Sequence, residues 1–118
     1  MTWEAEYTDE FNEWWETLTE DVQDSIDAAV EALEERGPAL GRPFVDTLTG
    51  SRIPNLKELR PLGTTVRVLF VFDPRRVAIL LLGGDKEGRW QEFYAEAIPL
   101  AERLYEEHLD ELRREGTI

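Results

Sequence analysis

Apolar residues along the first third of the chain follow two different periods. Between Thr2 and Tyr7 every second residue is apolar or aromatic, which predicts a short edge strand. Asp9 to Glu16 then carries aromatic residues at helical spacing, which indicates a first helix. A second stretch predicts an amphipathic helix, because most of its apolar residues lie three or four positions apart: Leu18, Val22, Ile26, Ala29, Val30 and Leu33.

The second helix has recognisable ends. Thr17 or Thr19 can act as its N-cap, because a threonine hydroxyl accepts a hydrogen bond from a free backbone N–H of the first turn. Gly37-Pro38 is a stop signal. The residues from Gly37 to Pro54 hold no sustained period and predict a long connection with one short strand near Phe44 to Leu48.

The centre of the chain has the pattern of strands. Leu56 to Arg60 can pair with Val66 to Phe72 in a hairpin, whose second strand places its alternate apolar residues on one face. These residues are Val66, Val68, Phe70 and Phe72. A turn at Pro74-Arg75 leads into Val77 to Leu82, a fully apolar run typical of a central strand covered on both faces. Gly83 to Gly88 is expected to be a flexible loop.

The remainder is expected to be helical, with apolar residues three or four apart from Trp90 to Leu112. Pro99 should kink this helix or begin it afresh, since a helix interior tolerates proline poorly. Helices and strands in separate blocks predict an α+β fold: a small antiparallel sheet with two N-terminal helices and a C-terminal helix. The length suits one domain over residues 1–118.

The composition indicates the cellular compartment in which the protein acts. The chain has no cysteine, which excludes disulfides and thiolate zinc sites and fits a reducing environment. No run approaches the ~18 apolar residues of a membrane span, and the acidic N-terminus lacks the pattern of a signal peptide. We therefore expect a soluble cytoplasmic protein without a membrane partner.

The net charge of −13 argues at first against a nucleic-acid partner, because phosphate binding needs Lys and Arg. The distribution changes this picture. Met1 to Glu35 hold 13 acidic and no basic residues, Arg36 to Trp90 hold 10 basic against 5 acidic, and Gln91 to Ile118 hold 3 basic against 8 acidic. Either solvated helix faces flank an ordinary sheet, or an anionic protein presents one cationic site.

The first hairpin brings two arginines together. If a four-residue loop from Leu62 to Thr65 closes it, Arg60 faces Arg67 on one sheet face, where like charges are destabilising and need a reason. Glu58 shares that face, while Lys57 points the other way.

A phosphate site is one such reason. If Pro74 and Arg75 form a two-residue turn, the second hairpin brings Asp85 and Lys86 beside the start of the Arg67 strand. Arg60, Arg67 and Lys86 then form a candidate phosphate cradle. The alternative is that Glu58 and Asp85 neutralise the arginines in surface ion pairs.

Other catalytic signals are weak. The chain has no nucleotide-binding glycine loop and no usual set of metal ligands, so no metal or cofactor is predicted. His108, the only histidine, lies on the apolar stripe of the last helix, where a packing or surface role is expected. Trp90 and Tyr94 follow the basic loop and are candidates for stacking on an RNA base.

Three segments carry a further pattern: Leu56 to Pro61 with its Leu-Arg pair, Val66 to Pro74 with Arg-Val-Leu-Phe, and Ile79 to Lys86 with its terminal Gly-x-x-Lys. In this order they resemble the RelE/ParE toxin superfamily, specifically its HigB or phage-derived toxin-like branch. The resemblance implies a RelE-like fold for the whole chain.

The resemblance also implies a function. Such a protein is the toxin of a type II toxin-antitoxin pair, neutralised by a cognate helix-turn-helix antitoxin, and it cuts mRNA in the ribosome by metal-independent attack of a ribose 2′-OH on the adjacent phosphate. By position, Arg60 and Arg67 should stabilise the scissile phosphate, and Lys86 should do the same or act as the acid. Lys57 could serve as the base, and Tyr94 matches a late aromatic of the family.

Two alternatives stay open. One is a gyrase-poisoning toxin of the same superfamily. The other is a non-catalytic interaction protein whose acidic helices form the functional surface. The joint presence of Arg60, Arg67 and Lys86 favours the nuclease, whereas the acidic helices weigh against it.

Overall fold

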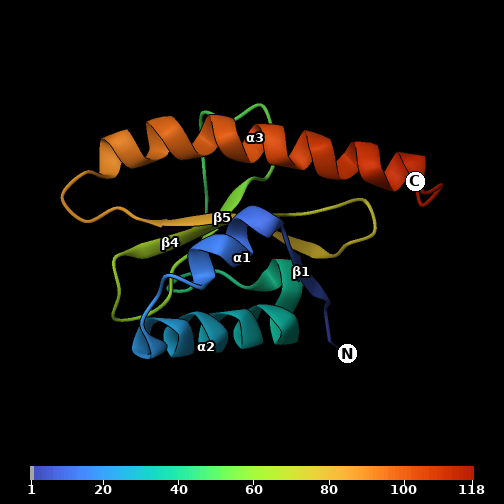
Figure 1. Ribbon diagram of the computed structural model, residues 1–118. Coiled ribbons are helices and arrows are strands. Elements are labelled where there is room, and N and C mark those ends of the chain that lie inside the picture. Colours follow the sequence, from blue (N-terminus) through green and yellow to red (C-terminus); the bar gives the residue numbers. More distant parts are fainter. Residues whose placement is uncertain (1) are drawn as a thin grey trace.

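The protein, described from a computed structural model over residues 2–118, places a five-stranded sheet between helices. The strand order is β1-β5-β4-β3-β2, with β1 and β2 at the edges. Helices α1 and α2 cover one face, and the long helix α3 covers the other (Figure 1). The predicted α+β class, with two N-terminal helices and one C-terminal helix, is confirmed.

The two N-terminal helices begin at threonine caps. Helix α1 spans Asp9–Trp15 and is capped by the Thr8 hydroxyl, which accepts from the Phe11 N–H. Helix α2 spans Glu20–Arg36 and is capped by Thr19, one of the two predicted candidates. It ends at Gly37, whose positive φ of 58° suits glycine, and a short 3₁₀ turn, η1, follows over Gly37–Ala39.

The strands lie close to where the apolar pattern placed them. They are β1 Ala5–Tyr7, β2 Val45–Thr47, β3 Lys57–Leu59, β4 Val66–Phe72 and β5 Ala78–Asp85. The short strand expected near Phe44 to Leu48 is therefore confirmed as β2. Strand β1 is an edge strand as predicted, but it runs parallel to β5 in a sheet that is otherwise antiparallel.

The alternation along β4 divides the interior into two apolar layers. Val66, Val68 and Phe70 are buried beneath α1 and α2, as the period of two predicts. Leu69 and Val71 are buried beneath α3. Arg67 has the same parity as Leu69, so its side chain starts on the α3 side of the sheet.

The predicted register of the first hairpin is confirmed. Lys57 pairs with Phe70 and Leu59 with Val68, and continuing this register by one residue sets Arg60 opposite Arg67.

The predicted register of the second hairpin is wrong. Its loop has three residues instead of two, because the Asp73 N–H donates to the Val77 carbonyl and Arg76 takes the left-handed conformation with φ of 66°. A bulge between Leu69 and Phe70 shifts the pairing again and leaves Leu81 unpaired. Asp85 nevertheless lies beside Val66, so the end of β5 still meets the start of the Arg67 strand.

The glycine pair at the end of β5 was expected in a flexible loop, and that expectation is wrong. Gly83 and Gly84 continue the strand and pair with Val68 and Arg67. Aromatic rings press on both: a Cβ at Gly83 would lie 2.2 Å from the Trp14 ring, and one at Gly84 would lie 2.6 Å from the Phe93 ring. These glycines make room for one helix on each side of the sheet.

Helix α3 spans Trp90–Arg114 without interruption, so it does not begin afresh at Pro99. Pro99 is exposed, and the Ala95 carbonyl that loses its usual N–H partner can bind water instead. None of the helices in residues 2–118 has the length and apolar character needed to cross a membrane.

The packing of Trp14 on Gly83 gives a first prediction. Gly83→Ala should lower the free energy of unfolding by about 1–3 kcal/mol, because the ring has to move off the strand. Gly41→Ala is the control, since nothing lies within 4 Å of the added carbon, and it should change stability by less than about 0.5 kcal/mol. Urea denaturation followed by tryptophan fluorescence measures both, and equal midpoints for the two variants would contradict the packing.

Candidate active site

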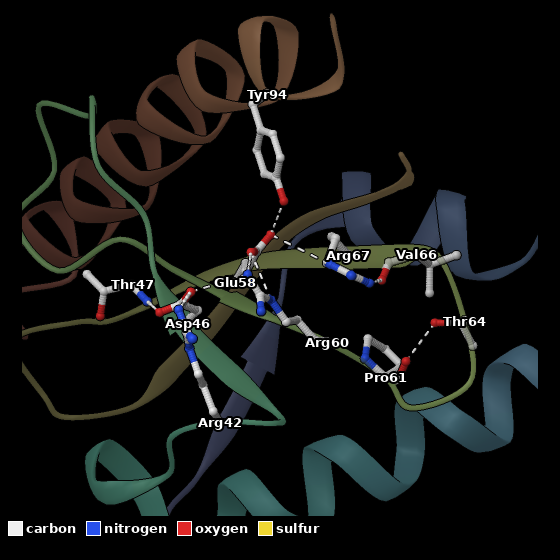
Figure 2. Close-up of polar contacts among 10 residues, drawn as sticks. All are labelled: Arg42, Asp46, Thr47, Glu58, Arg60, Pro61, Thr64, Val66, Arg67 and Tyr94. Atoms are coloured by element: carbon white, nitrogen blue, oxygen red, sulfur yellow. Dashed lines mark hydrogen bonds and ion pairs between the residues drawn. The ribbon is translucent and has the colours of Figure 1, made fainter. Parts of the chain in front are cut away.

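A buried carboxylate lies at the centre of the predicted phosphate site. Glu58 in β3 is 1% exposed and points toward α3, because it pairs with Leu69 on that face of the sheet. A buried carboxylate is costly unless cations and hydrogen-bond donors surround it. Three side chains from different elements meet this requirement (Figure 2).

Two of these side chains are the predicted arginines. Arg60 donates to Glu58 Oε2 from Nε at 3.0 Å and from a terminal nitrogen at 2.8 Å, which is a two-point contact. Arg67 approaches the other oxygen, with Nε 3.9 Å from Oε1, and donates from its terminal nitrogen to the Val66 carbonyl at 2.7 Å. The arginines therefore share one carboxylate and lie on one face of the sheet.

The third side chain is Tyr94, which reaches down from α3. Its hydroxyl donates to Glu58 Oε1, the oxygen that faces Arg67. Burial, together with the hydrogen bond to Glu58, raises the pKa of Tyr94 to about 12, so the phenol keeps its proton at neutral pH. The contact joins the N-terminal part of α3 to β3 (Figure 2).

A second carboxylate extends the cluster to the edge of the sheet. Asp46 in β2 accepts from Arg60 at 3.2 Å and from Arg42 at 3.0 Å. The hydrogen bond from Arg42 lowers the pKa of Asp46 despite an opposing effect of burial, and Arg60 contributes to the same direction. The hydrogen bond to Glu58 likewise raises the pKa of Arg60 above its usual value.

The cluster has unused donor capacity. Among residues 2–118, Arg67 Nε is the one buried side-chain nitrogen or oxygen that has no hydrogen-bond partner. Such an unpartnered group is unusual in a folded protein and costs stability. Because this nitrogen is buried, a ligand reaches it only if the side chains around it move.

The structure brings some of the predicted residues together and separates others. Arg60, Arg67 and Tyr94 converge on Glu58. Lys57 lies on the opposite side of β3, where its amino group donates to the Thr47 hydroxyl at 3.3 Å. This placement gives no support to Lys57 as the base of this site.

The remaining predicted residues lie around the cluster. Lys86 follows β5, and its backbone N–H donates to the Thr65 carbonyl just before β4. Trp90 is 58% exposed and lies one helical turn before Tyr94 on α3, so its ring is accessible to a ligand. Asp85 does not pair with an arginine: it accepts from Thr65, which lowers its pKa, with a smaller contribution from the charge of Arg67.

Sequence reasoning gave Glu58 only the role of neutralising the arginines at the surface. It does neutralise them, but from a buried position at the centre of the site. The sequence did contain a sign of this burial. Glu58 lies two residues before Arg60, on the same face of the sheet, and it pairs with the apolar Leu69. No group of three or more His, Asp or Glu side chains within residues 2–118 is arranged to hold a metal ion.

His108 has a polar partner that the apolar stripe did not reveal. Its Nε2 lies 2.9 Å from Oδ2 of Asp73, a buried residue of the β4–β5 turn that also accepts from Arg75. Burial alone would raise the pKa of Asp73, but the contacts with His108 and Arg75 outweigh it and lower that pKa. The ring of His108 stacks on Tyr105, and the contact of His108 with Asp73 joins the C-terminal half of α3 to the β4–β5 turn.

The five-stranded sheet, with two N-terminal helices on one face and the C-terminal helix on the other, is a RelE-like fold, as the sequence resemblance implied. The chain belongs to the family described as phage derived protein Gp49-like (DUF891), whose model matches residues 13–106.

Two relatives from Mycobacterium tuberculosis are similar over most of this chain. The protein named "Putative toxin HigB3" is 50% identical over 96 residues, which cover 81% of this chain and 84% of the relative. The one named "Putative toxin HigB2" is 46% identical over 110 residues, which cover 91% of this chain and 54% of that longer relative. The chain is therefore a homologue of proteins named as HigB toxins.

Solved structures show the same fold at low identity. A mutant of the E. coli toxin RelE in the free state superposes with a TM-score of 0.64 at 17% identity, covering 84% of this chain and 97% of that one. A chain of the archaeal RelE-RelB complex from Pyrococcus horikoshii OT3 superposes with a TM-score of 0.60 at 18% identity, covering 75% of this chain and 99% of that one. These structures establish a RelE-like fold.

The contact between Tyr94 and Glu58 gives a second prediction. An unfolded tyrosine ionises near pH ~10, whereas the folded pKa of Tyr94 is raised to about 12. The stability that this phenol contributes is therefore fully present below pH ~10 and is lost as the pH rises toward the folded value. Denaturation curves between pH 8 and pH 11 should show a steeper loss of stability in the wild type than in Tyr94→Phe. Parallel curves would contradict the assignment.

Proposed function

We propose that this protein is the toxin of a type II toxin-antitoxin pair and cuts mRNA on the ribosome without a metal ion. The observation that carries the proposal is the convergence of Arg60, Arg67 and Tyr94 on one buried carboxylate. The kinship with proteins named as HigB toxins supports it, because proteins of this superfamily are typically ribonucleases.

The arginines supply the site for the scissile phosphate. Guanidinium groups bind phosphate oxygens at two points and keep their charge when partly buried. Arg60 is 32% exposed and Arg67 is 13% exposed, so both can reach a ligand while remaining held by the sheet. They would stabilise the extra negative charge that develops on phosphorus when the 2′-oxygen attacks.

Glu58 and Tyr94 supply the proton transfers. Glu58 accepts the proton of the ribose 2′-OH while that oxygen bonds to phosphorus, and the bond to the 5′-oxygen breaks. The departing 5′-oxygen takes a proton from Tyr94, whose phenol is protonated at neutral pH. The products are a 2′,3′-cyclic phosphate and a free 5′-hydroxyl. Bound RNA would replace the resting hydrogen bond between Tyr94 and Glu58.

Two peripheral residues complete the proposal. Trp90 offers an exposed ring for stacking on a base next to the cleaved bond. Lys86, beyond the end of β5, adds positive charge beside the start of β4.

The proposed partners are the ribosome with its mRNA and an antitoxin. The fold relative from Pyrococcus horikoshii OT3 was solved as a RelE-RelB complex, which supports an antitoxin partner for this chain as well. We propose a helix-turn-helix protein in this role and the cytoplasm as the place of action.

A non-catalytic role also has one observation in its favour. In the resting structure Glu58 and Asp46 already satisfy Arg60, and Glu58 lies near Arg67, as in a purely structural ion-pair cluster. Such a cluster would hold the β2–β3–β4 edge together without binding RNA. Activity measurements separate the two roles.

The test is induced expression in bacteria, with primer extension on a reporter transcript and cleavage by purified protein on programmed ribosomes. The wild type should arrest growth and create new transcript ends. Arg67→Ala should reduce the cleavage rate about 10²- to 10³-fold, the usual effect of removing one donor to a developing oxyanion. Glu58→Gln, which keeps the shape of the side chain, should also lose activity because it removes the base.

Arg103→Ala is the matched control, because Arg103 is an exposed arginine of α3 whose ion pair within residues 2–118 is with the exposed Glu107. It should cut like the wild type, and circular dichroism confirms that every variant folds. Growth arrest without new transcript ends would point to gyrase or another target. No arrest, or full cleavage by Glu58→Gln and Arg67→Ala, would favour the non-catalytic role.

A further inference from the structure

A third arginine lies next to the pair that contacts Glu58. Arg42 belongs to the segment between η1 and β2, and its terminal nitrogen donates to Asp46 Oδ2 at 3.0 Å. Arg60 donates to the same oxygen at 3.2 Å. Two guanidinium groups therefore meet at one carboxylate oxygen, and the Arg42 side chain is the more accessible of the two, with 76% exposed against 32% (Figure 2).

The backbone also holds Arg42 in this position. The Phe44 N–H donates to the Gly41 carbonyl at 3.1 Å, which closes a turn around Arg42. The Arg60 N–H donates to the Phe44 carbonyl at 2.7 Å, so this turn is tied to the residue that follows β3. The place of Arg42 beside Arg60 therefore depends on main-chain hydrogen bonds as well as on the ion pair with Asp46.

The charges of this group do not cancel. Three cations, Arg42, Arg60 and Arg67, share two carboxylates, Asp46 and Glu58. The group therefore keeps an excess positive charge in a protein whose net charge is −13. An exposed ion pair contributes little to the free energy of unfolding. The stability of the fold thus does not explain why a third cation is held at this place.

The three arginines form a row across the sheet. Arg67 lies in β4, Arg60 follows β3 and Arg42 precedes β2, which is the order of these strands in the sheet. A strand of RNA carries one phosphate for each nucleotide, so its charges also form a row. Arg42 uses one terminal nitrogen for Asp46, and the further N–H donors of its exposed guanidinium suit a phosphate oxygen.

We propose that Arg42 binds the phosphate adjacent to the scissile one, so that Arg42, Arg60 and Arg67 hold two consecutive phosphates of one RNA strand. Asp46 is the positioning residue of this subsite, because it holds Arg42 beside Arg60. The inference rests on the proposed function for the place of the scissile phosphate. It adds a group that binds the substrate and takes no part in breaking the bond.

The test uses the full chain labelled with ¹⁵N and short uridine RNAs in which every ribose carries a 2′-O-methyl group, so that no attack on phosphorus is possible. A dinucleotide has one phosphate and a trinucleotide has two. A third probe is the trinucleotide with one linkage replaced by a neutral methylphosphonate. NMR titrations that follow the backbone and arginine Nε signals give the Kd of each probe. The trinucleotide compared with its neutral version isolates the charge of the second phosphate.

The second phosphate should strengthen binding through Arg42. At low salt the wild type should bind the trinucleotide about three- to tenfold more tightly than the neutral version, a gain between that of an exposed ion pair and that of a charged hydrogen bond. In Arg42→Ala most of this gain should be lost, whereas the dinucleotide should bind both proteins alike. The slope of log K against log salt for the trinucleotide should be smaller by about 0.7 in the variant, because one phosphate contact is lost.

Arg103→Ala is again the matched control. Arg42 and Arg103 are both exposed and pair with the carboxylate four residues later, Asp46 and Glu107, so the two variants make the same change in charge. Arg103→Ala should keep the full gain from the second phosphate. Circular dichroism should show both variants folded, since an exposed ion pair contributes little to stability.

Three results would overturn the subsite. One is the same gain from the second phosphate in Arg42→Ala as in the wild type, and another is no binding of the trinucleotide to the wild type. The third is an equal loss of the gain in Arg42→Ala and Arg103→Ala, because the attraction would then depend on net charge alone. If Arg42→Ala weakens binding of a diglutamate peptide but not of the trinucleotide, Arg42 belongs to a protein interface instead.

The cleavage assay separates this inference from the proposed function. On programmed ribosomes Arg42→Ala should raise KM about three- to tenfold with little change in kcat, because a phosphate that does not react is bound alike in the ground state and the transition state. If the wild type binds the probes as expected but cuts no RNA, the ribonuclease proposal fails and the subsite stands. If the wild type cuts RNA and Arg42→Ala binds and cuts like it, the subsite alone fails.

Discussion

The burial of the Glu58 carboxylate is the constraint on which the rest of this site depends. A carboxylate that is 1% exposed persists as a charged group only when cations and hydrogen-bond donors compensate for the lost water. The compensation comes from Arg60, from Arg67 across the β3–β4 pair and from Tyr94 on α3. One buried charge therefore fixes the position of a helix and two strands relative to each other.

The Glu58 carboxylate does not satisfy every hydrogen-bond donor around it. Arg67 Nε is buried and has no hydrogen-bond partner, although it lies 3.9 Å from Glu58 Oε1. A purely structural cluster would be expected to satisfy every buried donor. The unpartnered donor, next to an arginine that is still one third exposed, is the feature by which this cluster differs from an ordinary ion-pair network.

The sheet also separates opposite charges. The segment from Met1 to Glu35 has 13 acidic residues and no basic residue, and its helices cover one face of the sheet. The arginine cluster lies on the other face, beneath α3. A net charge of −13 repels RNA at long range, so RNA binding would depend on short-range contacts at the cluster. The net charge of the protein therefore predicts the local charge of neither the α1–α2 face nor the arginine cluster.

Sequence alone determined the elements and the first hairpin, because apolar periods and threonine caps are local signals and a four-residue loop fixes the pairing of Arg60 with Arg67. It also placed Tyr94 among the candidates. Only the tertiary structure decided the second hairpin, since nothing local shows that Arg76 takes a left-handed conformation or that Leu81 bulges. It likewise decided that Gly83 and Gly84 form strand, because the rings that press on them come from distant helices. The central role of Glu58 could not be read locally either: a carboxylate becomes buried or exposed according to what packs over it, and here that is α3, 36 residues further along the chain at Tyr94.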